Sequence, residues 1–481
     1  MQLKILRKMN IQLTKIDELK ENFSTGVLFD ELKQLSLSSL LENETIYLKN
    51  RFEKKEEAVI YKYPNLLFFH KIKEEKDAFS KLEIARVAGA KLYKLLQKET
   101  IDSIQLMNFC DLELMYPFIE GILLASYSFS KYKSKKEEFS LKEILVLDCQ
   151  ISESQLSELL ILSEAVFIAR DLVNEPLSTL TAQKLSEEVS RLGDEAGYET
   201  EVFHHQKIKS LKMGGLLAVN KGSIDPPTFS VLEWKPENAT NKKPIVLVGK
   251  GIVFDTGGLS LKPTPNSMDY MKSDMGGAAA VIAAIYALAK TKSPVHVIGL
   301  IPATDNRPDG NAYVPGDVIT MYDGTTVEIR NTDAEGRLIL ADALSYAKKL
   351  GPSLVIDLAT LTGSASMLTG SAGSVVMGNS KENLNLLKEA GDQIHERLVE
   401  LPLWEDLKKP LKSTIADLNN LGTREGQTII AGKFLEHFTN YPWIHLDIAG
   451  SAFIFEDDGY RPKGGTGSGT RLLFNFLNKI K

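Results

Sequence analysis

The hydrophobic pattern of the chain changes near residue 174. From there onward, short apolar runs alternate with longer stretches of helical periodicity. The predicted strands are 245–248, 295–300, 326–329 and 354–358, and the predicted helices span about 276–290 and 338–349. This alternation is typical of βαβ units, which form a largely parallel sheet covered by helices. The C-terminal part is therefore predicted to be an α/β domain with a mostly parallel central sheet.

The first 150 residues have a different hydrophobic pattern and a different composition. Strand-like runs such as 58–61, 66–69 and 144–147 are mixed with a helical stretch at 85–97. The segment is rich in Lys, Glu and Ser and poor in glycine, and no chemical motif stands out in it. We predict a smaller α/β domain over residues 1–150.

A long amphipathic stretch separates these two parts. Ser152 suits a helix N-cap, and Gln155, three residues later, completes a capping box. Asn174-Glu175-Pro176 ends the pattern, because proline cannot continue a helix. The predicted organisation is a domain at 1–150, a connecting helix at 151–173 and a larger domain at 174–481.

The composition of the chain argues against several classes of protein. The hydrophobic fraction is 43% and the charged fraction 25%, as in ordinary globular proteins. A net charge of −6 gives no general attraction to nucleic acid or to an anionic membrane. No segment approaches the roughly 20 apolar residues of a membrane helix, and no secretory leader is apparent. Cys110 and Cys149 lack CxxC spacing, which favours buried thiols over a disulfide. We expect a cytoplasmic protein without a membrane partner.

Charged residues gather just after the predicted strands, where ligands bind in open α/β sheets. Four carboxylates, two lysines and one arginine would share this edge: Asp255, Asp274, Asp333, Glu335, Lys250, Lys262 and Arg337. Alone, the segment RNTDAEGRL at 330–338 would be a helix start with acids favoured by the helix dipole. Several such features together favour a binding site instead.

Metal ions would explain why so many acids converge. Clustered carboxylates repel one another unless cations neutralise them. These loops contain no cysteine or histidine, so their ligands suit Mg²⁺ and Mn²⁺, while Zn²⁺ also accepts carboxylates. Bridging carboxylates can hold two metals about 3.5–4 Å apart, where they activate a water and polarise a substrate oxygen. A dinucleotide site is disfavoured, because Phe254 stands where VGKGIVF would need its third glycine.

Five segments, in this order, resemble the leucyl aminopeptidase family, peptidase family M17. They are KGIVFDTGGLSLKP, MKSDMGGAAAV, NTDAEGRLILADAL, DLATLTGS and WIHLDIAG, and the likeness extends over about 165–481, including ARDLVNEP. The resemblance implies a smaller N-terminal domain of macro-domain type and a C-terminal catalytic domain. It also implies a cytoplasmic two-metal exopeptidase that removes N-terminal residues from peptides through a metal-bridging hydroxide.

The resemblance implies a role for each charged residue. The tighter metal site would use Lys250, Asp255, Asp274 and Glu335, and the more exchangeable site Asp255, Asp333 and Glu335. Lys262 and Arg337 occupy the family's catalytic positions, and Arg337 would hold a bicarbonate. Zn²⁺ or Mn²⁺ is expected, and Mg²⁺ or Co²⁺ would also fit such ligands.

The resemblance also implies a pocket for the first side chain of a peptide with a free N-terminus. Met271, Thr360, Gly363 and Ala452 fall at its lining positions, and this mixture suits an apolar side chain such as leucine. A Cys-Gly-type dipeptidase and a nucleic-acid-binding regulator on the same fold stay open as alternatives, although the acidic pI makes nucleic acid a poor partner. Members of the family form homohexamers, which we expect here too.

Overall fold

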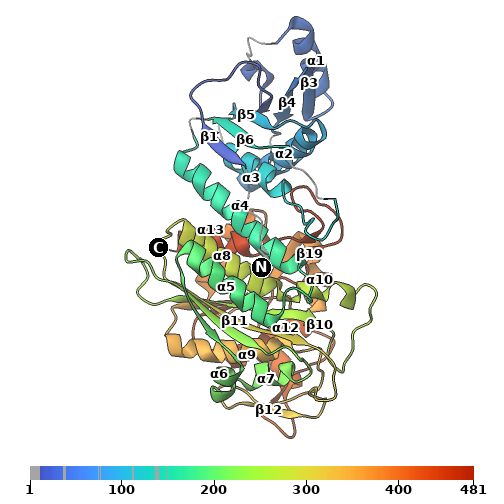
Figure 1. Cartoon of the computed structure of the whole chain (residues 1–481), viewed down its shortest axis with the longest axis vertical. Coiled ribbons are helices and arrows are strands. Elements are labelled where there is room, and N and C mark those ends of the chain that lie inside the picture. The colour runs from blue at the N-terminus through green and yellow to red at the C-terminus, as the bar shows by residue number, and fades with distance from the viewer. Residues whose placement is uncertain are drawn as a thin grey trace.

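The computed structural model describes residues 11–35, 40–73, 75, 77–110, 113–135, 140–148 and 150–480. It contains two α/β units, each built around its own sheet, with the N-terminal unit at the top of Figure 1 and the larger unit below it. The long helix α4, Glu153–Asn174, runs between them. The predicted fold class is confirmed.

The N-terminal sheet has the strand order β1-β6-β5-β2-β4-β3, and only the edge pair β3–β4 is antiparallel. Its strands are β1 (Gln12–Lys15), β2 (Thr25–Phe29), β3 (Glu57–Lys62), β4 (Asn65–Lys71), β5 (Ser103–Asn108) and β6 (Glu143–Leu147). Its helices are α1 (Glu42–Phe52), α2 (Ala78–Lys98) and α3 (Met115–Ala125). Helix α2 starts earlier than predicted, because the side chain of Asp77 caps it by accepting from Ser80 N.

The central sheet of the larger domain has the order β16-β15-β18-β14-β9-β11-β8-β7, and β10 pairs with β11. The middle strands β18, β14, β9 and β11 are parallel, whereas β8 joins β11, and β15 joins β18, in antiparallel fashion. These strands are β7 (Glu199–Phe203), β8 (Thr228–Trp234), β9 (Ile245–Gly249), β10 (Gly251–Asp255), β11 (Val297–Asn306), β14 (Leu354–Ala359), β15 (Gly373–Gly378), β16 (Arg397–Glu400) and β18 (Trp443–Asp447).

Helices cover both faces of this sheet. Alternate side chains of β9 point to opposite faces, so that Leu247 packs into the core under α4, α5, α8, α11 and α13, and Val248 into the core under α6, α7, α9 and α12. The bounds are α5 (Ala182–Ala196), α6 (His205–Ser210), α7 (Gly214–Asn220), α8 (Gly276–Lys290), α9 (Gly336–Ala347), α11 (Lys381–Gln393), α12 (Gln427–His437) and α13 (Thr470–Lys479). Helix α8 is buried along nearly its whole length, which explains its continuous apolar sequence.

One predicted strand lies outside the central sheet. Residues 326–329 form β13 (Thr326–Glu328), which pairs with β12 (Val318–Thr320) and β17 (Leu418–Asn419) in a separate three-stranded sheet. The prediction that RNTDAEGRL follows a strand of the central sheet is therefore wrong. A short β run has a local pattern that fits any sheet, so its partners cannot be inferred from it.

Helix α4 ties the two domains together. The predicted capping box is present, because Ser152 Oγ accepts from Gln155 N at 3.2 Å and Gln155 Oε1 accepts from Ser152 N at 2.9 Å. Farther along, the buried Arg170 donates to the carbonyl of Leu124 in the N-terminal domain and to that of Thr466 in the larger domain. The guanidinium therefore binds both domains at once.

A buried ion network adds a second connection between the domains. Glu120 in α3 accepts from Arg86 Nε at 2.6 Å and from Arg471 Nη1, in α13 of the larger domain, at 3.0 Å. All three side chains are buried, and each charge is balanced by hydrogen-bonded partners. The N-terminal domain is thus bound to α13, one of the helices that cover the central sheet of the larger domain.

None of the described helices is both long and apolar enough to cross a membrane. Cys110 is buried, whereas Cys149 lies outside the described residues.

Candidate metal centre

The charged residues predicted to form a site come from several elements. They meet near the carboxyl-terminal ends of the strands in the central sheet. Lys250 stands between β9 and β10, and Asp255 ends β10. Asp274 lies in the 3-10 helix η2, Met268–Met275, directly before α8. Glu335 is the residue before α9, and Asp333 precedes it in the same turn. The structure therefore brings together groups that are up to about 85 residues apart in the chain (Lys250 and Glu335).

Lys250 joins two of the acids. Its Nζ lies 2.8 Å from Asp274 Oδ1 and 3.0 Å from Glu335 Oε1, and it donates to the carbonyl of Thr360 at 2.9 Å. The side chain is only 3% exposed. Gly336 makes this placement feasible, because a Cβ there would lie 2.5 Å from Lys250 Cε. A side chain at position 336 would therefore force the Lys250 side chain to move.

Lys262 joins the other two acids. Its Nζ lies 2.9 Å from Asp255 Oδ2 and 2.5 Å from Asp333 Oδ1. Its side chain is 15% exposed and that of Asp333 is 31% exposed, so this half of the cluster is the part nearest to solvent. The two lysines therefore pair with different acids, one deep in the protein and one at its opening.

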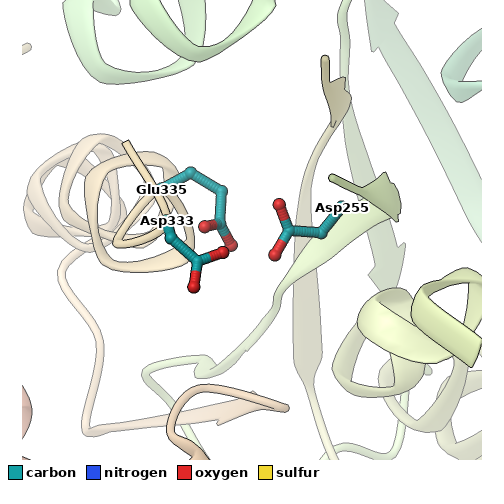
Figure 2. Close-up of side chains that lie close together, drawn as sticks. All are labelled: Asp255, Asp333 and Glu335. Carbon is teal, nitrogen blue, oxygen red and sulfur yellow. The ribbon is translucent and has the colours of Figure 1, made fainter. Parts of the chain in front are cut away.

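Three carboxylates are close enough to share metal ions. Asp255, Asp333 and Glu335 each offer an oxygen within 4.8 Å of the others, and Figure 2 shows Asp255 pointing across a gap toward the other two. Among the described residues, Asp274 Oδ2 and Glu335 Oε2 are buried without a hydrogen-bond partner. Buried carboxylate oxygens that lack donors are suitable ligands for hard divalent cations, so the residues present fit a metal site.

The charges of the cluster are not balanced by protein groups alone. Two ammonium groups face four carboxylates, and burial together with the negative Asp255 and Glu335 raises the pKa of Asp333 to about 7. Burial acts to lower the pKa of Lys250, but Asp274 and Glu335 outweigh it and raise that pKa. As a metal ligand Lys250 would have to lose its proton, which a neighbouring dication favours.

Arg337 lies beside this cluster on the first turn of α9. It is 4% exposed, its Nη1 donates to the carbonyl of Asn420 at 2.9 Å, and it stacks over Phe434 at 5.9 Å. Its Nε is buried and has no partner in the described part of the protein. Burial lowers the pKa of Arg337 to about 10, so the guanidinium stays charged at neutral pH. One N–H group of this guanidinium therefore has no hydrogen-bond partner among the described residues.

The cluster forms the floor of a cleft of about 990 Å³. All four predicted pocket residues, Met271, Thr360, Gly363 and Ala452, line this cleft with the metal-site acids. A Cβ on Gly276 would lie 3.2 Å from Ala452 Cβ and 3.4 Å from Thr360 Cγ2, so these two side chains lie close together. The volume is ample for a side chain and several peptide units.

Sequence reasoning missed residues that position the charged cluster, among them Asn306 and Asp447. Asn306 ends β11, and its Nδ2 donates to Asp255 Oδ1 at 2.8 Å and to the carbonyl of Thr332 at 3.0 Å. Asp447 ends β18 and accepts from Leu361 N at 3.0 Å, which fixes the loop whose Thr360 binds Lys250. Both stand at strand ends, so polar residues after an apolar run were the available signal.

Fold and site together define a class of protein. Buried carboxylates and lysines gather at the carboxyl end of a parallel sheet, beneath a cleft that can hold a peptide. This is the donor set and the place expected of a metal-dependent hydrolase.

Comparison with known proteins identifies the family. Residues 167–474 match the model of the cytosol aminopeptidase family, catalytic domain. The chain is 44% identical over 366 residues to a probable cytosol aminopeptidase of Geobacter sp. (strain M21), covering 75% of this chain and 74% of the relative. A probable cytosol aminopeptidase of Clostridium perfringens is 42% identical over 406 residues, covering 82% and 81%. The chain belongs to the cytosol aminopeptidase family and is a metal-dependent aminopeptidase.

A solved structure has a similar fold over nearly the whole chain. The bottromycin maturation enzyme BotP in complex with Mn superimposes with a TM-score of 0.85 at 31% identity, covering 95% of this chain and 99% of that one. The N-terminal domain is thus included in the likeness, although the five sequence motifs lie in the larger domain.

Proposed function

We propose that this protein uses two divalent metal ions to hydrolyse the N-terminal residue from peptides, with a preference for apolar residues such as leucine. The observation that carries the proposal is the meeting of Asp255, Asp333 and Glu335 within 4.8 Å beneath the cleft. Manganese is named in the complex of the similar BotP structure, and Mn²⁺ or Zn²⁺ suits this ligand set.

Five side chains would hold the two ions. One ion would bind Lys250, Asp255, Asp274 and Glu335, and the other Asp255, Asp333 and Glu335. When bound, the ions would lower the pKa of a water to near neutrality and polarise the scissile carbonyl. The buried acids fix the ion positions, because their partners Asn306 and Lys250 leave them few alternative orientations.

The chain's own groups supply the remaining steps. Lys262, at the solvent side of the cluster, can donate a hydrogen bond to the oxygen that becomes negative as the peptide carbonyl is attacked. Arg337 has a planar guanidinium, and its paired N–H donors suit an oxyanion such as bicarbonate. With that anion held, a proton could pass from the attacking water to the departing amine.

Arg337 should therefore affect turnover more than substrate binding. We expect Arg337→Ala to lower kcat about 100-fold, the scale of one general acid–base contribution, while KM changes less than about threefold. The measurement is steady-state hydrolysis of leucine p-nitroanilide by the metal-loaded enzyme. Arg330→Ala is the matched control, since this neighbouring arginine is largely exposed, and an unchanged kcat in the Arg337 variant would reject the role.

Substrate choice can be tested with a small panel of peptides. We expect hydrolysis of Leu-Gly-Gly, Met-Gly-Gly and Phe-Gly-Gly, slower hydrolysis of Asp-Gly-Gly, and at least about 1,000-fold slower hydrolysis of N-acetyl-Leu-Gly-Gly. A free amine can bind a metal ion through its lone pair, whereas an acetylated nitrogen cannot. Equal rates on the free and acetylated peptides would rule out an aminopeptidase, and a strong preference for Cys-Gly would favour a dipeptidase.

We also propose a homohexamer in the cytoplasm, as the resemblance to family M17 implies. A monomer has a mass of 53.3 kDa, so sedimentation should show a species about six times heavier.

A further inference from the structure

We propose that Asn420 is a positioning residue that clamps both ends of the metal-binding turn 330–337. The proposal rests on the proposed function, because it concerns the turn that carries Asp333, Glu335 and Arg337. Asn420 follows β17 in the small three-stranded sheet and comes about 85 residues later in the chain than the turn it contacts. Asn420 is not among the residues that line the cleft, so we expect it to act through the turn.

The side chain of Asn420 holds the beginning of the turn. Its Oδ1 accepts from Arg330 N at 2.7 Å and from Asn331 N at 3.3 Å. Its Nδ2 donates to the carbonyl of Asn331 at 2.7 Å. The side chain is fully buried, so water cannot replace these bonds without a change in structure. Three backbone groups at the start of the turn thus depend on one amide.

The backbone of Asn420 holds the end of the turn. Its carbonyl accepts from Arg337 Nη1 at 2.9 Å, and its N–H donates to the carbonyl of Glu328 in β13 at 3.0 Å. The residue is therefore fixed to β13, to the first residues of the turn and to the guanidinium of Arg337 at the end of the turn. Asp333 and Glu335 lie between these attachment points.

Loss of the amide should loosen the turn without unfolding the protein. The middle of the turn keeps other supports, because Tyr313 Oη and Asn306 Nδ2 both donate to the carbonyl of Thr332. Residues that hold metal ligands in place without binding the metal themselves typically change metal affinity or activity by about 10- to 100-fold. The expected defect is thus in the placing of the acids and of Arg337.

The adjacent residue offers a matched control. Asn419 is also an asparagine, is 3% exposed and makes three side-chain hydrogen bonds, but its partners are Pro410, Lys412 and Leu421. None of these partners belongs to the turn. Asn419→Ala should therefore cost stability, as Asn420→Ala does, while leaving the turn intact.

The first experiment is backbone hydrogen exchange in the metal-free protein, followed by mass spectrometry. We expect Asn420→Ala to speed exchange of the Arg330 and Asn331 amides at least about tenfold, because a hydrogen-bonded amide exchanges only when its bond opens. Asn419→Ala should leave these amides at the wild-type rate. Equal exchange in wild type and Asn420→Ala would overturn the clamp, and this readout does not depend on activity.

The second experiment measures kinetics of the metal-loaded enzymes. Asn420→Ala should lower kcat for leucine p-nitroanilide about 10- to 100-fold with KM within about threefold. Asn420→Asp, which keeps an acceptor for the Arg330 and Asn331 amides, should recover part of the exchange protection. An equal fall of kcat in Asn419→Ala and Asn420→Ala would show a general loss of stability and overturn the proposal. Wild-type protein that cleaves no peptide would instead refute the aminopeptidase function, while exchange would still decide the clamp.

Discussion

Replacing Asp333 with Asn and Glu335 with Gln together should reduce kcat/KM on leucine p-nitroanilide by at least about 1,000-fold. The two changes remove two of the three carboxylates that lie within 4.8 Å of one another. Metal ions contribute several kcal/mol to such reactions, and each 1.36 kcal/mol is a factor of about ten in rate. The amides are nearly isosteric with the acids, so the shape of the cleft should persist.

The two single variants should differ in the stability of the metal-free protein. Burial raises the pKa of Asp333 to about 7, so the ionised carboxylate costs stability at pH 8, and a neutral amide at this position removes that cost. Glu335 is the opposite case, because Lys250 and Lys262 outweigh burial and lower its pKa. At pH 8, Asp333→Asn should keep or raise the Tm of the metal-free protein, and Glu335→Gln should lower it.

A double variant at the surface provides the control for this prediction. Asp309 and Glu237 are exposed and do not line the cleft. Changing them to Asn and Gln makes the same change in net charge, and activity should stay within about twofold of wild type. Near-normal turnover by the Asp333/Glu335 double variant, confirmed as folded by circular dichroism, would remove the basis of the metal site.

The sequence was sufficient to predict those elements and site residues that a local pattern of apolar and charged residues identifies. The apolar runs at β9 and β14 and the continuous apolar helix α8 are found where they were predicted. Lys250 and Asp255 stand at strand ends of the central sheet, as the rule for parallel sheets predicts, whereas Asp333, Glu335 and Arg337 reach them from the segment after β13 of the separate sheet. These features follow from neighbouring residues and from a general rule of α/β sheets.

What the sequence could not predict depends on contacts between distant segments. Residues of β13 look like any short strand, and only their pairing with β12 and β17 shows that they belong to a separate sheet. Asn306 and Asn420 were missed for the same reason, since an isolated asparagine after a strand resembles a turn residue until its partners are known. Their bonds to Asp255 and to the turn exist only in the folded chain.

Removal of metal should abolish activity and lower thermal stability, and the second effect should depend on pH. After treatment with a chelator, we expect less than about 1% of the original hydrolysis and recovery on adding Mn²⁺. A ligand present at about 100 times its Kd stabilises the folded state by about 2.7 kcal/mol. The ions would offset the repulsion among four acids that face only two ammonium groups. Addition of Mn²⁺ should therefore raise the Tm by several degrees in wild type and by much less in the Asp333/Glu335 double variant.

The pH dependence follows from Asp333, whose pKa is raised to about 7 in the metal-free protein. A carboxylate must lose its proton before it can bind a metal, so protons compete with the ion below that pH. The concentration of Mn²⁺ needed for a given rise in Tm should thus be higher at pH 6 than at pH 8, by about tenfold for each pH unit below 7 if one proton is displaced. Asp333→Asn should weaken binding at both values and flatten this dependence. An Mn²⁺ requirement that is the same at pH 6 and pH 8 in wild type would contradict a role for the Asp333 carboxylate as a ligand.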